Sequence, residues 1–185
     1  MDPRGLPVIG LLASVVVAEA VEEMSGLRAG LKWPNDILLN GRKAGGVLSE
    51  VDLDEMSVGQ IILGVGFNLN VDLDKLPDEI RGTSTSLREE IGRWTSEEEF
   101  VSLFLRKFDV KYSQIGKEGS SKVLNRWREL STSLGSRVAI RTVTETFMGT
   151  ALDIDEDGAL IVEKDQGERR KFLSGDVAAL RDWKI

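Results

Sequence analysis

The hydrophobic pattern of the first part of the chain predicts one buried helix. An apolar run at residues 6–18 becomes polar at Glu19 and Glu22, and Gly26 follows. Apolar residues at helical spacing followed by a glycine are typical of a core helix with a glycine cap, here over about residues 7–24. The positions expected to face the core are Leu11, Leu12, Val15 and Val16.

The next stretch changes to short strands separated by turns. We expect a strand near 27–33, a Trp-Pro-Asn-Asp turn at 33–36 and a short strand at 37–39, because proline favours an extended residue before it and Asn and Asp form turns. Asn40-Gly41 is the dipeptide of a type I′ hairpin turn. The chain should therefore return as a strand over about 43–52.

A third strand is predicted over about 56–71 and contains Gly64 and Gly66. Glycines inside a strand usually mark a bulge or the close approach of a ligand or another backbone. Residues 72–95 have the composition of a connecting region, and a Ser-Glu-Glu-Glu capping box at 96–99 then starts a helix.

Two helices and then a group of short strands are predicted for the rest of the chain. The apolar positions of the helices are Phe100, Leu103, Phe104, Phe108, Tyr112 and Ile115, and then Val123, Leu124, Trp127 and Leu130. From about residue 133, short alternating runs predict about five strands, which is typical of a small SH3-like barrel. We therefore predict an α+β fold with a mixed or antiparallel sheet in residues 1–132, followed by a small all-β domain in residues 133–185.

Composition narrows the chemistry that the chain can perform. The 185 residues are 41% hydrophobic and 30% charged, as in a globular protein, and the net charge is −7. An acidic chain is not expected to bind DNA, because nucleic-acid surfaces are normally basic. The sequence contains no Cys and no His, which excludes thiol nucleophiles, imidazole bases and the usual zinc ligands. The lack of Cys fits a cytoplasmic location.

The apolar run at 6–18, followed by Ala18-Glu19-Ala20, also imitates a secretory signal peptide. The run is too short to cross a bilayer, which needs about 20 apolar residues, and Asp2 offsets the charge of Arg4. We favour a core helix and no membrane association. A secreted protein that uses residues 1–20 as a signal is the alternative.

The stretch LKWPNDILLNGRKAGGVL at residues 31–48 concentrates polar side chains around one proline turn and two glycines. Its Asn and Asp residues are turn formers when taken alone. Lys43, however, carries a mobile charge that suits a phosphate or carboxylate, and Gly45-Gly46 leaves the backbone open to a flat ligand. The glycines and Asn of residues 64–68 could form the facing wall of the same pocket.

These stretches together resemble the catalytic domain of biotin–protein ligases, also called biotin–[acetyl-CoA-carboxylase] ligases. The resemblance rests on KWPND at 32–36, GRKAGGVLSE at 41–50 and ILGVGFNLN at 62–70, in that order and at compatible spacing. Residues 83–87 are similar to the family's Ala-Thr-Ser-Leu segment, and the C-terminal strands match its SH3-like domain. The resemblance covers nearly the whole chain and implies a class II synthetase-like catalytic fold.

The resemblance implies a two-step acyl transfer. The carboxylate of biotin attacks the α-phosphate of Mg²⁺-bound ATP to give biotinyl-5′-AMP and pyrophosphate, and a lysine of a biotin carboxyl carrier protein then attacks the mixed anhydride. Because the substrates supply both nucleophiles, the absence of Cys and His agrees with this chemistry. Catalysis would come from positioning and charge stabilisation.

Roles carried over by position make Lys43 and Asp36 the catalytic residues. The expected biotin contacts are Lys43, Gly46, Leu48, Gly64 and Gly66. The expected nucleotide contacts are Lys32, Trp33, Asn35 and Asn68, and the candidates for Mg²⁺ are Asp36 and Asn68. Arg42 receives no catalytic role, because a basic residue on a hairpin is usually solvated.

The family's Gly-Arg-rich loop, GRGRxGR, precedes KWPND in its members and is not found in this sequence. That loop closes over biotin and the adenylate, so we expect this polypeptide alone to be a poor ligase. It would pair with a second chain that carries the N-terminal half, or be a truncated enzyme. The remaining sheet should expose an edge or an apolar face, which favours partner pairing or a homodimer.

Two other functions remain open. A lipoate–protein ligase has a related fold and the same adenylation chemistry, although KWPND followed by Arg-Lys favours biotin. A non-catalytic accessory subunit could keep the fold and bind a carrier protein, although the presence of Lys43, Asp36 and Asn68 argues against a pure scaffold.

Overall fold

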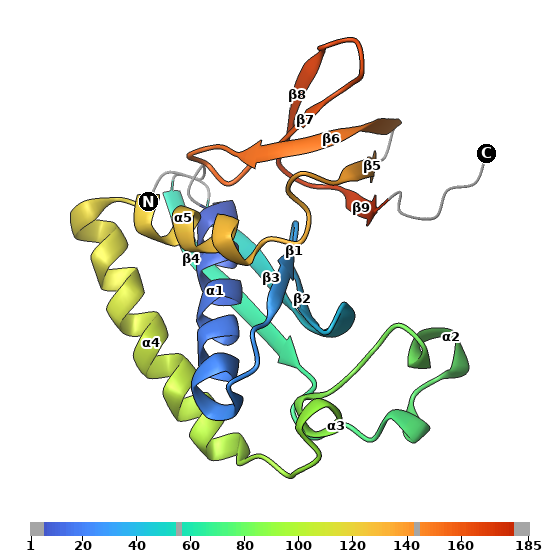
Figure 1. The fold of residues 1–185 in the computed structure, drawn as a ribbon. Helices are drawn as coiled ribbons and strands as arrows, with labels where there is room; N and C mark the ends of the chain where they lie inside the picture. The colour runs from blue at the N-terminus through green and yellow to red at the C-terminus, as the bar shows by residue number, and fades with distance from the viewer. Residues whose placement is uncertain (1–5, 55–56, 143–144, 180–185) are drawn as a thin grey trace.

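The computed structural model describes residues 6–54, 57–142 and 145–179. A long helix, α1, lies between further helices on one side and a four-stranded sheet on the other, and a five-stranded sheet lies across one end (Figure 1). Every strand pair within the two sheets is antiparallel. The α+β class expected from the sequence is confirmed.

The helix α1 (Leu6–Ser25) forms the centre of the core, as the sequence predicted. Leu12, Val15 and Val16 are fully buried, because other elements contact the helix from several sides and an all-round apolar helix must be covered all round. The helix ends where Gly26 adopts φ 75° and donates its N–H to the carbonyl of Glu22 at 2.8 Å. Glycine takes this left-handed conformation at little cost.

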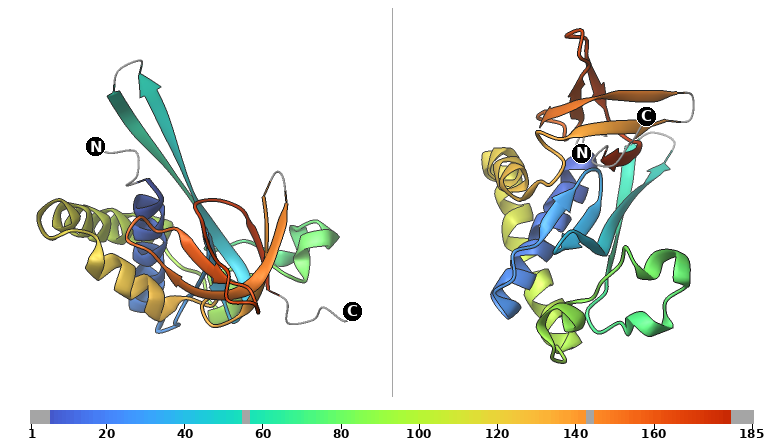
Figure 2. Two further views of the ribbon diagram at one scale, coloured as in Figure 1. Left: turned by 90° about the horizontal axis from the view of Figure 1, so that it is seen from above. Right: turned by 45° about the vertical axis from the view of Figure 1, so that its right-hand side comes forward.

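The first sheet is a simple antiparallel meander. Its strands are β1 (Gly30–Lys32), β2 (Asp36–Leu39), β3 (Arg42–Asp54) and β4 (Ser57–Phe67), paired in that order. Asn40 at φ 48° and Gly41 at φ 79° form the β2–β3 turn, and the positive angles at both positions agree with the predicted hairpin. Figure 2 shows the paired β3 and β4 reaching beyond the body of the protein.

Two strands are shorter than the sequence suggested. Strand β1 begins at Gly30 rather than near residue 27. Strand β4 ends at Phe67 rather than near residue 71, because the carbonyls of Asn68 and Leu69 accept hydrogen bonds from a connecting helix instead of a neighbouring strand. The connecting region between the sheet and the long helices contains a 3₁₀ turn (Leu73–Lys75), α2 (Asp78–Arg81) and α3 (Leu87–Ile91).

Two amphipathic helices, α4 (Glu97–Glu118) and α5 (Ser121–Leu130), pack against α1. The predicted N-terminus of α4 is confirmed, because the Ser96 hydroxyl accepts the N–H of Glu99 at 3.2 Å. Phe100 of α4 stacks on Phe67 of β4 with 5.2 Å between ring centroids. This contact ties the helices to the end of the sheet.

The C-terminal part forms the second sheet, with the number of strands that the sequence predicted. The strands are β5 (Arg137–Arg141), β6 (Thr146–Ile154), β7 (Leu160–Glu163), β8 (Arg169–Phe172) and β9 (Asp176–Ala179), in the order β8-β7-β6-β5-β9. Among the described strands no pairing joins β8 to β9, so closure into a barrel stays a prediction.

Hydrogen bonds donated by Trp33, the residue after β1, join the first sheet to the C-terminal part of the chain. Its indole Nε1–H donates to the carbonyl of Gly158 at 3.1 Å, and its backbone N–H donates to the hydroxyl of Ser133 at 3.0 Å. A second link is made by Arg128 of α5, which donates to the Asp153 carboxylate and to the carbonyl of Ile154.

Within the described ranges, no helix has both the length and the apolar character needed to cross a membrane.

We expect Trp33→Phe to lower the free energy of unfolding by about 1–3 kcal/mol, because it leaves the buried Gly158 carbonyl without its donor. Urea denaturation followed by circular dichroism measures the change. The matched control is Trp94→Phe, because the Trp94 side chain is 65% exposed and should contribute less than about 0.5 kcal/mol. Equal stability of the two variants would contradict the proposed link.

Candidate active site

A bulge in β3 places Lys43 on the open face of the first sheet. Asp36 pairs with Gly46, but the pairing then shifts between Ile37 and Leu38 so that Leu38 pairs with Lys43. The extra residue is Ala44, whose carbonyl accepts the N–H of Asn68 at 2.7 Å. Because side chains alternate along a strand, this extra residue brings Lys43 and Gly46 to the same face.

The two faces of this sheet differ in what covers them. Val47 is buried on the face that packs on α1, whereas Leu48 is 58% and Ile62 56% exposed on the opposite face. On that open face Leu48 lies opposite Gly64, and Gly46 lies opposite Gly66. Strand β4 is also one of the two edge strands of the described sheet. The structure thus brings the predicted biotin contacts together as one open surface of glycines and apolar side chains.

The glycines on this face are not required by the packing of the described chain. A Cβ atom built on Gly64 would lie 3.7 Å from its nearest neighbour, and one on Gly66 would lie 3.9 Å away. Gly45 is different, because a Cβ there would lie 2.5 Å from the carbonyl oxygen of Gly66 and 2.8 Å from the Phe67 ring. Gly45 therefore serves the fold, whereas Gly64 and Gly66 leave space above the sheet.

Asp36 lies between two lysine side chains at the end of this surface. Its Oδ1 forms an ion pair with Lys43 Nζ, and its Oδ2 lies 3.6 Å from Lys32 Nζ. The Asp36 side chain is 18% exposed, and that of Lys43 is 54% exposed. The carboxylate thus holds the ammonium group of Lys43, which remains accessible from solvent. The ammonium group of Lys32 lies beside the same carboxylate.

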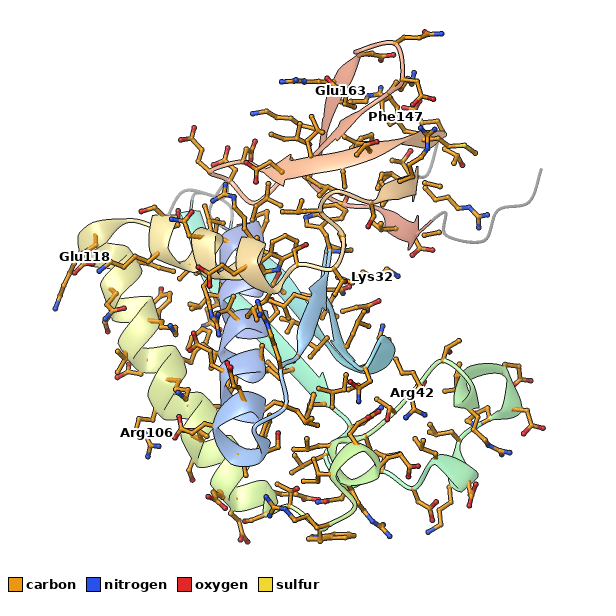
Figure 3. The ribbon with its side chains drawn as sticks, viewed as in Figure 1. Lys32, Arg42, Arg106, Glu118, Phe147 and Glu163 are labelled. Carbon is orange, nitrogen blue, oxygen red and sulfur yellow. The ribbon has the colours of Figure 1, made fainter. Side chains whose placement is uncertain are left out.

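The charged residues line a cleft of about 590 Å³ between the two sheets, which we call the Lys43 cleft. Its polar walls are made by residues of the first sheet, of the connecting region and of the linker after α5: Lys32, Asp36, Lys43, Thr83, Ser84, Thr132, Ser133 and Ser136. Figure 3 shows Lys32 on the side of β1 that faces the C-terminal sheet. Apolar side chains complete the lining, namely those of Leu38, Ile80, Val138 and Val177. Two lysines against one carboxylate give the cleft a positive charge that suits a negatively charged ligand.

The remaining predicted nucleotide contacts lie at different depths. Asn35 is half-buried in the turn after β1, and its carbonyl accepts the N–H of Val47 at 3.0 Å. Asn68 is half-buried, and its Nδ2 donates to the carbonyl of Thr85 at 3.0 Å. Trp33 is only 2% exposed and faces the core, so any effect of its side chain on a nucleotide would be indirect.

The described residues alone do not form a complete magnesium site. They contain no cluster of three or more acidic groups that could hold a metal ion, and the Asp36 carboxylate is already shared by two lysines. Asp36 and the amide of Asn68 nevertheless offer oxygen ligands of the kind that Mg²⁺ accepts. Because Mg²⁺ is usually held by one or two carboxylates together with substrate phosphates, ATP would have to bring most of its ligands.

Sequence reasoning missed Glu90, whose side chain is only 6% exposed. Its Oε1 accepts from the Thr85 hydroxyl at 2.6 Å and from Arg42 Nη2 at 2.8 Å, and its Oε2 accepts from Asn40 Nδ2 at 2.6 Å. Figure 3 shows Arg42 beside the loop that carries α2. Arg42 thus has a structural partner, whereas the sequence predicted only a solvated side chain.

Burial raises the pKa of the Glu90 carboxyl, but hydrogen bonds from Thr85 and Asn40, together with the charge of Arg42, outweigh it and hold the pKa below its usual value. The sequence predicted only a connecting region at residues 72–95, so the short helix α3 that carries Glu90 was not expected. No periodic pattern marks a contact with a hairpin about 50 residues away, so the signal was too weak to find it.

Two protein-family models match the chain. The model described as the Biotin/lipoate A/B protein ligase family matches residues 1–68, and the one described as Biotin protein ligase C terminal domain matches residues 133–179. A biotin–[acetyl-CoA-carboxylase] ligase of Paracoccus denitrificans is 32% identical over 176 residues, which cover 91% of this chain and 73% of that protein. This chain belongs to the biotin protein ligase family.

Other relatives in the biotin protein ligase family are longer. The bifunctional ligase/repressor BirA of Bacillus subtilis is 34% identical over 171 residues, covering 92% of this chain but 52% of that protein. The chain thus spans about half the length of this relative. A biotin–[acetyl-CoA-carboxylase] ligase of Mycobacterium tuberculosis is 31% identical over 179 residues, with 60% of its length covered.

Solved structures of the family share this fold. A crystal structure of biotin protein ligase from Aquifex aeolicus has a TM-score of 0.84 at 23% identity, covering 97% of this chain and 79% of that one. The same enzyme in complex with biotin and ATP has a TM-score of 0.81 at 24% identity, covering 96% and 74%. At this level of identity the likeness establishes the fold.

The folded-state pKa of Glu90 predicts how stability changes with pH. Because it lies below the value of about 4.3 for an unperturbed glutamate, Glu90 stabilises the protein above that pH and loses this contribution as pH falls through the folded-state pKa. We expect wild type to be more stable than Glu90→Gln near neutral pH. The difference should shrink as the solution is acidified below about pH 4.

Urea midpoints of the two proteins between neutral and acidic pH measure this difference. Other carboxyls with lowered pKa values, at Glu23, Asp155, Asp165 and Glu168, are present in both proteins and cancel in the comparison. A gap in stability that does not change with pH would contradict the assignment. Glu89→Gln, on the exposed side of the same helix, should show no gap.

Proposed function

We propose that this chain takes part in the ATP-dependent activation of biotin to biotinyl-5′-AMP and in transfer of the biotinyl group to a lysine of a biotin carboxyl carrier protein. The observation that carries the proposal is the Lys43–Asp36 ion pair at the border between the glycine-lined face of the sheet and the polar Lys43 cleft. The border is where a biotin carboxylate and a nucleotide phosphate would have to meet. Membership of the family supports the reaction class.

In this proposal the open face of β3 and β4 receives biotin. Gly46, Gly64 and Gly66 leave main chain accessible to a flat ring system, and Leu48 offers an apolar side chain beside it. Burial of the ligand's apolar surface favours binding. The biotin carboxylate then points toward Lys43, which lies on the same face.

Lys43 supplies the positive charge at the reacting atoms. Its ammonium group stabilises the negative charge that grows on the α-phosphate while the biotin carboxylate attacks it, and pyrophosphate leaves. Asp36 holds this ammonium group in place before the substrates arrive and, with Asn68, offers oxygen atoms toward Mg²⁺ brought by ATP. Lys32 and Asn35 contribute to the nucleotide side. Because the charges are fixed by the sheet, little reorganisation is needed during the reaction.

Further predictions made from the sequence, on domains, partners and location, also belong to this proposal. We divide the chain at residue 132 into a catalytic part and an SH3-like C-terminal domain, which is supported by the family match that starts at residue 133. The carrier protein, a homodimer, a second polypeptide that completes the site and a cytoplasmic location belong to it as well. The exposed apolar face and the edge strand support assembly, and the net charge of −7 supports the prediction that the chain does not bind DNA.

The direct test is to incubate the protein with Mg²⁺ and ATP labelled at the α-phosphate, adding either biotin or lipoate, and to separate the products by chromatography. With biotin we expect a labelled adenylate, formed only slowly because this polypeptide lacks the Gly-Arg-rich loop, and with lipoate we expect none. An adenylate formed only with lipoate would replace the proposed substrate. Binding of a carrier domain without any adenylate would favour the non-catalytic subunit.

We expect Lys43→Ala to reduce the rate of biotinyl-5′-AMP formation by about 10²–10³-fold, because one preorganised charge at the reacting phosphate is lost. The folded state should be unaffected, since the Lys43 side chain is 54% exposed. Lys117→Ala removes a charge that is also exposed, from α4, and serves as the control. Retention of the wild-type rate by Lys43→Ala would exclude the proposed role.

The glycine face makes a second prediction that separates binding from folding. Gly66→Ala should leave the unfolding midpoint unchanged but weaken biotin binding by about tenfold to a hundredfold, because its methyl group enters the space assigned to the ligand. Gly45→Ala should instead lower stability by about 1–3 kcal/mol through its clash with the Gly66 carbonyl. Isothermal titration calorimetry and urea denaturation report the two effects, and unchanged biotin affinity in Gly66→Ala would place biotin elsewhere.

A further inference from the structure

The buried carboxylate of Glu90 has no role in the reaction described above, yet it joins three separate segments of the chain. It receives hydrogen bonds from Asn40 in the β2–β3 turn, from Arg42 at the start of β3 and from Thr85 just before α3. Thr85 is fully buried. Glu90, Arg42, Asn40 and Thr85 together are called the Glu90 clamp below.

The Glu90 clamp encloses the main chain of Lys43. The N–H of Lys43 donates to the carbonyl of Thr83 at 2.8 Å, and the carbonyl of Lys43 accepts the N–H of Thr85 at 2.8 Å. These two bonds form a short parallel bridge between β3 and residues 83–85. The clamp lies at both ends of this bridge, through Arg42 before Lys43 and through the Thr85 hydroxyl after it.

The same segment also holds the other predicted site residue on this side. The side-chain Nδ2 of Asn68 donates to the carbonyl of Thr85 at 3.0 Å. Thr83 and Ser84 line the Lys43 cleft. A shift of residues 83–85 would therefore move Lys43, Asn68 and one wall of the cleft together.

The contribution of ionised Glu90 to stability does not by itself explain why a carboxylate, and not an apolar side chain, lies there. Taking a charge out of water is costly, and an apolar side chain of similar volume often stabilises a protein as well or better. A buried carboxylate that accepts three hydrogen bonds instead fixes the direction of its donors. This matters most where main chain must be held within a fraction of an ångström.

We propose that Glu90 is a positioning residue for Lys43, holding residues 83–85 against the main chain of β3 so that the Lys43 ammonium, the Asn68 amide and the wall of the Lys43 cleft keep their relative places. The catalytic consequence rests on the proposed function, whereas the structural part does not. Glu90 does not touch the substrates. It acts through the main chain of Lys43 and Thr85.

Amide hydrogen exchange followed by NMR tests the structural part. In Glu90→Ala the amide protons of Lys43 and Thr85 should exchange at least about tenfold faster, because local opening of the bridge becomes easier. The amide of Val47 in the same strand, which donates to the Asn35 carbonyl, should not change. Glu90→Gln keeps an acceptor for Thr85 and Arg42 and should stay close to wild type.

Matched variants keep this experiment decisive. Glu89→Ala removes an exposed carboxylate from the neighbouring position of the same helix and should leave both amides protected. Thr85→Val removes one donor at nearly constant volume, and it replaces Glu90→Ala if that variant does not fold. Unchanged exchange at Lys43 and Thr85 in the folded variants would overturn the proposal.

Kinetics of biotinyl-5′-AMP formation test the catalytic part. We expect Glu90→Ala to lower kcat by about tenfold and to raise the KM for ATP more than the KM for biotin, because most of the biotin contacts lie on the glycine face, which is not part of the clamp. Glu90→Gln should restore most of the activity. Faster amide exchange with unchanged kinetic constants would make Glu90 a structural residue only and overturn the positioning role.

The two measurements also separate this proposal from the proposed function. If the wild-type protein forms no adenylate, the proposed function fails for this polypeptide. The exchange rates of Lys43 and Thr85 still decide whether the Glu90 clamp holds the bridge.

Discussion

Burial of the apolar part of α1, residues 8–18, is the constraint on which the rest of the architecture depends. This part of the helix is apolar all round, so it must be covered all round: α4 and α5 pack on it from one side and the first sheet from another. One face of that sheet is therefore committed to the core, and the side chains that alternate with the core residues must point away from it. The polar side chains and glycines of β3 and β4 therefore lie on the face that is turned away from α1, because the residues that alternate with them cover the helix.

The candidate site combines two environments that meet at one residue. On one side, glycines and apolar side chains offer a surface suited to an uncharged ring system, and on the other, hydroxyl and charged groups line the Lys43 cleft. Lys43 stands at the border, with Asp36 as its partner. A ligand that carries an apolar body and an anionic end matches this gradient, and activation of a carboxylic acid by a nucleotide requires such an arrangement.

Local signals predicted much of this fold, and non-local contacts account for what they missed. Asn40-Gly41 specifies its turn by backbone angles alone, and Gly64 and Gly66 marked the part of β4 where space is left above the sheet. Trp33 received its nucleotide role from the family resemblance, and no local pattern indicated that its indole bonds with Gly158, 125 residues away. Glu90 was missed for the same reason. Periodicity reports which face of an element is buried, and it carries no information about a polar partner from a distant segment.

The extra residue at Ala44 has a consequence for how this hairpin can vary. Lys43 and Gly46 are three positions apart, so in a regular strand their side chains would point to opposite faces. The bulge at Ala44 brings them to the same face. Deleting Ala44 would make the pairing regular and leave Lys43 on the same face as Gly46, but it would remove the carbonyl that accepts the N–H of Asn68. Inserting one more residue while the bulge is kept would instead turn the lysine toward α1 and bring a core side chain out into water. The bulge therefore does more than orient the lysine, because it also fixes the end of β4 to the strand that carries Lys43.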